Sequence, residues 1–164
     1  MQETKMQSRK VALVTGAATG LGHSIAEALL EAGYRVVITD QNLTLAEHAT
    51  AKWQESGLAT EDQLFPLKLD IREGADFKAA IEAVEKHWGA LQVVVNNAAM
   101  TKATPLLEIS ADEFSAVTDV NQRGTFLSCQ YFGKYLAQKG YGRIINMASL
   151  AGQNGGTATG AHYA

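Results

Sequence analysis

Three glycines are spaced so that the backbone around them could bind phosphate groups. They lie in the segment Thr15-Gly16-Ala17-Ala18-Thr19-Gly20-Leu21-Gly22, which joins a short apolar run to a stretch of helical periodicity. Glycine permits a tight turn, lets backbone approach a pyrophosphate without a Cβ in the way, and lets a helix pack closely on a sheet. The N-terminus of the following helix attracts phosphate through its free N–H groups and dipole. The segment therefore predicts a dinucleotide-binding loop in preference to an ordinary glycine-rich turn, with contacts from Gly16, Thr19, Gly20, Leu21 and Gly22.

A carboxylate follows at the end of the second apolar run. Asp40 lies about 20 residues beyond the glycines, where an acidic side chain accepts hydrogen bonds from the ribose hydroxyls of adenosine and repels a 2′-phosphate. The next residue is Gln41 and not an arginine, and Arg35 lies at the opposite end of the run. NAD is therefore favoured over NADP, with Asp40 as the ribose contact. The alternative role for Asp40 is the N-cap of the next helix, and both roles are compatible.

The glycine pattern T-G-x-x-x-G-x-G resembles that of the short-chain dehydrogenase/reductase family. Further motifs follow in the family's order, from Lys10 to Ala164. Asn96-Asn97-Ala98-Ala99 is similar to the family's N-N-A-G, with Ala99 in place of the glycine. The resemblance implies that Asp70 and Ile71 contact the adenine and that the cofactor also meets Asn97, Ala98 and Ala99. A solvated strand end is the alternative reading of Asp70.

The resemblance also implies a catalytic set, because Asn121, Ser149 and Tyr163 match the family's Asn, Ser and Tyr one by one. The implied function is an NAD(H)-dependent oxidoreductase that interconverts a secondary alcohol and a ketone by hydride transfer. Tyr163 would be the general acid/base, Ser149 would hold the substrate oxygen, and Asn121 would anchor a proton-relaying water. A phenol with a reference pKa near ~10 needs a neighbouring cation to act as a base near neutral pH.

The family's catalytic lysine would fall beyond Ala164. We therefore expect a piece that is truncated after the catalytic tyrosine, lacks the C-terminal strands and is inactive alone. The alternative function is a catalytically inactive dinucleotide-binding module or fragment. A nucleotide-sugar epimerase is a third possibility, which the glycine spacing disfavours. Cys129 is interpreted as a small buried hydrophobic residue and His162 as pocket lining or surface, and no histidine has partners at metal-ligand spacing, so no metal site is expected.

Strand-like and helix-like segments alternate along the chain, with no internal repeat. Buried-strand runs are expected at 11–15, 35–39, 64–69, 91–95 and 143–147, and helices at about 21–33, 43–55, 77–88 and 121–139. The S-x-x-E pattern at Ser110 predicts a further helix start, and residues 148–164 are expected to form a loop. This alternation predicts a Rossmann-type α/β fold: a doubly wound parallel sheet with helices on both faces. Pro66 puts the third strand at one edge, and the fifth is expected at the other.

The composition supports one globular domain over residues 1–164, with a loose tail over about 1–9. Hydrophobic residues make up 46% and charged residues 19%, which allows a real core. The net charge of -3 and the lack of a Lys/Arg cluster argue against a nucleic-acid partner. There is one cysteine, no apolar leader and no run of the ~20 apolar residues that a bilayer span needs, so we expect a cytoplasmic protein that does not enter membranes. The helix at 121–139 is apolar on two faces, which favours an oligomer contact. The family resemblance implies a homodimer or homotetramer.

Overall fold

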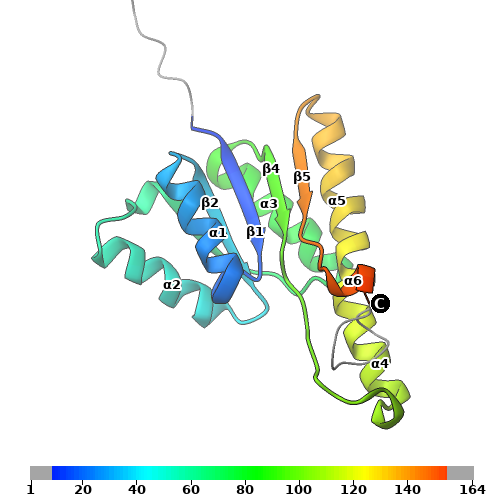
Figure 1. Ribbon diagram of the computed structural model, residues 1–164. Coiled ribbons are helices and arrows are strands. Elements are labelled where there is room, and N and C mark those ends of the chain that lie inside the picture. The colour runs from blue at the N-terminus through cyan, green and yellow to red at the C-terminus, as the bar shows by residue number, and fades with distance from the viewer. Residues whose placement is uncertain (1–8, 155–164) are drawn as a thin grey trace, which may run out of the picture.

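The computed structural model describes residues 9–154, and a sheet of five parallel strands lies at its centre (Figure 1). The strand order is β3-β2-β1-β4-β5. The strands are β1 (Val11–Thr15), β2 (Arg35–Asp40), β3 (Leu64–Lys68), β4 (Val93–Asn96) and β5 (Arg143–Asn146). The chain builds outward from β1 to β3 and then returns to place β4 on the other side of β1. This reversal defines a doubly wound Rossmann-type sheet, so the predicted fold class and both predicted edge strands are confirmed.

Helices cover both faces of the sheet. Figure 1 shows α1 (Gly20–Glu31) and α2 (Leu43–Glu55) in front of the strands and α3 (Gly74–Trp88) behind them. The second face also receives α5 (Thr125–Gln138), and residues of α3 and α5 share one core cluster. The shorter elements are η1 (Glu61–Gln63), η2 (Leu106–Glu108), α4 (Ala111–Thr118), η3 (Asp119–Gly124) and α6 (Ala151–Asn154). None of the helices within residues 9–154 has both the length and the apolar character needed to cross a membrane.

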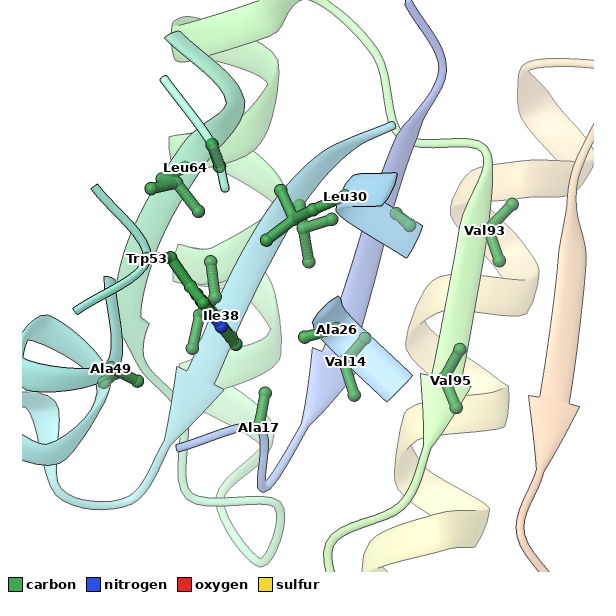
Figure 2. Packing of buried hydrophobic residues seen from close by; sticks show 14 residues of the cluster. Val14, Ala17, Ala26, Leu30, Ile38, Ala49, Trp53, Leu64, Val93 and Val95 are labelled. Atoms are coloured by element: carbon green, nitrogen blue, oxygen red, sulfur yellow. The ribbon is translucent and has the colours of Figure 1, made fainter. Parts of the chain in front are cut away.

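The central strand β1 is buried along its whole length because both faces of the sheet are covered. Its side chains alternate between the two cores, as the two-residue repeat of a strand requires. Ala12 and Val14 belong to the core under α1 and α2, while Val11 and Leu13 belong to the core under α3 and α5. Figure 2 shows the first core, where Ala26 of α1 lies near Val14.

The helical segment after residue 110 differs from the prediction. Its start is as predicted, since Ser110 Oγ accepts a hydrogen bond from the backbone N–H of Glu113 at 3.1 Å. The prediction that a separate helix starts at Asn121 was wrong. Helical backbone continues from α4 through the π-helical turn η3 into α5, because no residue between them breaks it, and Asn121 lies inside that turn.

Two smaller expectations also need correction. Residues 148–164 were expected to be loop, but the short helix α6 follows β5; residues 155–164, with His162 and Tyr163, lie outside the described part of the chain. Cys129 was expected to be buried and is partly exposed. Its Sγ lies 3.6 Å from Asn146 Oδ1, on the edge strand β5, where little of the chain covers it.

Candidate functional site

A cavity of about 370 Å³ opens where the strands end at their carboxyl termini. In doubly wound sheets, ligands bind at this edge, where the strand order reverses. The lining comes from segments that follow β1, β2, β3 and β4, together with one residue of η3. These residues are Gly16, Thr19, Asp40, Gln41, Leu69, Asp70, Ile71, Arg72, Asn97, Ala98, Ala99, Met100 and Val120.

The glycines of the first loop are required by close packing. Gly16 has a φ of +62°, and a Cβ there would lie 2.9 Å from the Cα of Ala98. A Cβ on Gly22 would lie 2.2 Å from the carbonyl oxygen of Gly16. Gly20 differs: its φ is +59°, and among the described residues no atom outside its chain neighbours and its own helix backbone would lie within 4 Å of a Cβ there. The loop is therefore held tightly against the end of β4 at Gly16 and Gly22, while Gly20 is exposed.

Thr15 and Asn97 fasten this loop to the end of β4. The hydroxyl oxygen of Thr15 accepts hydrogen bonds from the backbone N–H groups of Asn97 and Ala98, both at 3.0 Å. In return, Nδ2 of Asn97 donates to the carbonyl oxygens of Thr15 at 3.0 Å and Gly16 at 3.2 Å. Both N–H bonds of the Asn97 amide are thus used to hold the loop in place. Thr15 was not among the predicted site residues, although it directly precedes the first glycine of the loop in the sequence.

Asp40 ends β2 at the rim of the cavity. Its Oδ1 accepts a hydrogen bond from the backbone N–H of Asn42 at 2.9 Å. The N-cap of α2 is Asn42, whose Oδ1 accepts from the N–H of Thr44 at 3.1 Å, so the N-cap alternative for Asp40 is wrong. Within residues 9–154 the second carboxylate oxygen of Asp40 makes no hydrogen bond, which leaves it available to a hydroxyl donor.

A second carboxylate in the cavity, Asp70, is paired with Arg72. Nε and one terminal nitrogen of the guanidinium donate to Oδ1 and Oδ2 of Asp70 at 2.9 and 2.6 Å. These hydrogen bonds from Arg72 outweigh partial burial and hold the pKa of Asp70 below its ordinary value. Asp70 is therefore ionised near neutral pH, in a bidentate pair of fixed geometry. Arg72 was not predicted to be a site residue, although it lies only two residues after Asp70 in the sequence.

Of the three predicted catalytic residues, the structure describes Asn121 and Ser149, and these two lie in different surroundings. Asn121 forms two hydrogen bonds with the backbone of Met100, so it touches the cavity lining through that residue. Ser149 is exposed after β5, is not among the residues that line the cavity, and its Oγ accepts from the N–H of Ala151 at 3.1 Å. Tyr163 lies outside the described residues. The structure thus places Asn121 beside the cavity and Ser149 at the neighbouring strand end.

Residues 10–164 match the family described as short chain dehydrogenase. The chain belongs to this family. A D-threitol dehydrogenase of Mycolicibacterium smegmatis is 38% identical over 87% of this chain and 53% of its own length. A sorbitol dehydrogenase of Cereibacter sphaeroides is 33% identical over 94% of this chain and 58% of its own length. The chain therefore spans little more than half the length of the curated relatives it matches.

A solved structure supports the same assignment. A short chain dehydrogenase from Bacillus anthracis superposes with a TM-score of 0.85 at 29% identity, over 92% of this chain and 61% of its own. In this short-chain dehydrogenase chain, eight of the predicted cofactor contacts line the cavity: Gly16, Thr19, Asp40, Asp70, Ile71, Asn97, Ala98 and Ala99. Gly20, Leu21 and Gly22 are not among the lining residues, and Leu21 is 60% exposed. The lining residues that were not predicted are Gln41, Leu69, Arg72, Met100 and Val120.

Proposed function

We propose that this chain binds NAD and forms the cofactor-binding part of an oxidoreductase that interconverts a secondary alcohol and a ketone. One observation carries the proposal: a single cavity at the carboxyl ends of the strands is lined by the glycine loop, the Asp40 carboxylate and the residues that follow β4. Ligand pockets commonly have volumes of ~300–1,000 Å³, and this cavity falls within that range.

The residues present fit a dinucleotide. Gly20 is exposed, and the adjoining start of α1 provides N–H groups and a positive dipole end for phosphates. Asp40 has a carboxylate oxygen free for ribose hydroxyls and would repel a 2′-phosphate. Arg72 is already paired with Asp70, and no Lys, Arg or His side chain within residues 9–154 forms an ion pair with Asp40. The carboxylate of Asp40 therefore lies at the cavity without a paired cation from this part of the chain, which supports NAD over NADP.

Bound NAD would supply the acceptor for hydride, and the chain's own residues would position the substrate and move the proton. Tyr163 would exchange a proton with the substrate oxygen as general acid/base. Ser149 would hold that oxygen with its hydroxyl. Asn121 would act beside them by holding Met100 against the cavity. A polyol or its keto form is the substrate class supported by the relatives named for D-threitol and sorbitol.

We also propose that the protein forms a homodimer or homotetramer through α4 and α5. Phe114 on α4 and Phe126 on α5 are 44% and 60% exposed, and a second subunit packed on these helices would cover both side chains. Sedimentation of the wild-type protein and of Phe126→Ser measures this contact: we expect the variant to dissociate at higher concentration, and identical behaviour would contradict the proposal.

Titration of the purified chain with NADH and NADPH, followed by nicotinamide fluorescence, tests cofactor binding. We expect NADH to bind at least about tenfold more tightly than NADPH. Asp40→Ser should reduce the difference between the two dissociation constants, because it removes the carboxylate that repels the 2′-phosphate. Asp112→Ser, which removes an exposed carboxylate in the first turn of α4, is the control and should leave the ratio unchanged. A failure of both nucleotides to bind would contradict the proposal.

A further inference from the structure

The carboxylate of Asp70 has almost no acceptor capacity left. A carboxylate offers about four lone-pair sites, two on each oxygen. Oδ1 uses both of its sites on Arg72, accepting from the backbone N–H at 3.0 Å and from Nε at 2.9 Å. Oδ2 accepts one hydrogen bond, from the terminal guanidinium nitrogen at 2.6 Å. One lone-pair site therefore remains, on Oδ2. The hydrogen bonds from Arg72 determine which of the four sites stays free.

The pair lies where this remaining site can meet a ligand. Asp70 and Arg72 line the same cavity as Asp40, the proposed ribose contact. The side chain of Asp70 is 19% exposed, so it is largely enclosed and still reachable. Its backbone is fixed as well, because its N–H donates to Asp76 Oδ2 at 2.9 Å, at the start of α3. Backbone and side chain are thus both held, and the free lone pair has a defined direction.

We propose that Arg72 is a positioning residue that makes the pocket selective for a purine carrying a 6-amino group. This inference rests on the proposed function, since it concerns the base of the bound dinucleotide. A fixed carboxylate lone pair accepts a hydrogen bond from a 6-amino group, as in adenine. A 6-oxo group, as in hypoxanthine, presents an acceptor to the same lone pair and is repelled.

The geometry of Arg72 matters as much as its charge. A guanidinium holds both carboxylate oxygens in one plane through a rigid fork, whereas an ammonium is a point charge on a flexible stem. Arg72→Lys keeps the positive charge next to Asp70 but releases the carboxylate to rotate. A rotating carboxylate can turn away from a 6-oxo group, so the penalty against hypoxanthine falls.

The test compares the dissociation constants of NAD and nicotinamide hypoxanthine dinucleotide, measured calorimetrically with the full chain. For the wild-type protein we expect adenine to be preferred on the order of tenfold, the usual effect of one charged hydrogen bond. For Arg72→Lys we expect the two dissociation constants to differ by no more than about threefold. The contribution of the phosphate groups to binding should be largely retained. Arg9→Lys is the matched control, because Arg9 is also a partly exposed arginine paired with an aspartate, Asp62, at 3.3 Å, but precedes β1 at the opposite end of the sheet.

The outcomes separate the inference from the function on which it rests. A wild-type chain that binds neither dinucleotide overturns the proposed function and the inference together. If the wild-type chain binds NAD but Arg72→Lys leaves the ratio of the two dissociation constants unchanged, only the role given to Arg72 is overturned. Equal weakening of both dinucleotides by Arg72→Lys points to a purely structural role and also overturns it. Far-ultraviolet circular dichroism of each variant checks that the fold is intact.

Discussion

The side chain of Asn121 pairs with the backbone of Met100 like one peptide group with another. Its Oδ1 accepts from the N–H of Met100 at 2.8 Å, and its Nδ2 donates to the carbonyl oxygen of Met100 at 2.9 Å. Met100 lines the cavity, and Asn121 lies in the π-helical turn between α4 and α5. Such turns are frequent at functional sites. This one brings a helix side chain to the segment that follows β4, so Asn121 contributes to the site by holding backbone in place.

The first prediction concerns this pair. Asn121→Asp keeps an acceptor for the N–H of Met100 but sets a carboxylate against its carbonyl oxygen. We expect the segment after β4 to loosen and NADH affinity to fall about tenfold, since one hydrogen bond is lost and a repulsion is added. Fluorescence titration measures the change. Gln122→Ala, at the exposed neighbouring position of the same turn, is the control, and an equal loss in both variants would contradict the role given to Asn121.

The second prediction uses two helical glycines that differ in their surroundings. A Cβ on Gly22 would lie 2.2 Å from the carbonyl oxygen of Gly16 and 2.4 Å from Asn97 Nδ2. Gly22→Ala must therefore displace the glycine loop, and we expect it to lower the free energy of unfolding by about 1–3 kcal/mol and to weaken NADH binding. Gly133→Ala is the control, since its Cβ would lie 3.8 Å from Ile144 Cδ1, an ordinary contact. It should be neutral or stabilising by up to about 1 kcal/mol, because alanine favours the helix. Urea unfolding measures both variants. A Gly22→Ala variant with the same free energy of unfolding as Gly133→Ala would contradict the prediction.

The third prediction compares two buried threonines that are register partners on β1 and β2, Thr15 and Thr39. Their exposures are 1% and 0%, so Thr→Val is the same change of shape at both positions. Thr15→Val removes the acceptor of two backbone N–H groups. We expect it to lower the free energy of unfolding by about 2–4 kcal/mol. Thr39→Val removes one donor, to the carbonyl oxygen of Val14 at 2.9 Å, and should cost about 1 kcal/mol. Equal midpoints in urea would show that the Thr15 hydroxyl does not hold the end of β4.

Features encoded by local sequence were predictable. The buried runs at 11–15 and 35–39 are continuous because helices cover both faces of the sheet, and Pro66 is accommodated on the edge strand. The glycine loop was also recognisable from the sequence, because close packing at Gly16 and Gly22 leaves no room for a Cβ and so requires glycine.

Features that depend on tertiary contacts were missed. Arg72, Met100 and Val120 reach the cavity only because three separate segments meet there. The π-helical turn was not foreseen because one inserted residue in a helix has no strong sequence signature. The partial exposure of Cys129 follows from its place over an edge strand, which helical periodicity alone does not reveal.

The fourth prediction concerns acid stability and a polar cluster on the second face of the sheet. Burial raises the pKa of Tyr135 to about 12, so its hydroxyl stays protonated and donates to Glu85 while accepting from the N–H of Leu91 at 3.1 Å. Burial also raises the pKa of Glu85, but hydrogen bonds from Tyr135 and Lys139 outweigh that effect and hold it below its ordinary value. The carboxylate therefore stabilises the fold above the unfolded-state pKa of about 4.3, and this stability is lost as the pH falls through the lower folded-state value.

Tyr135→Phe should lower the free energy of unfolding at neutral pH by about 1–3 kcal/mol, because it leaves the buried N–H of Leu91 without its acceptor. Because the variant also removes one cause of the lowered pKa of Glu85, its stability should fall less steeply than that of the wild type between about pH 5 and pH 3. Urea midpoints across this range measure both effects. Tyr131→Phe, one turn earlier on α5, is the control, since Tyr131 stacks on Phe77 and its hydroxyl forms no hydrogen bond within residues 9–154. Parallel pH profiles for the wild type and Tyr135→Phe would show that the tyrosine does not set the titration of Glu85.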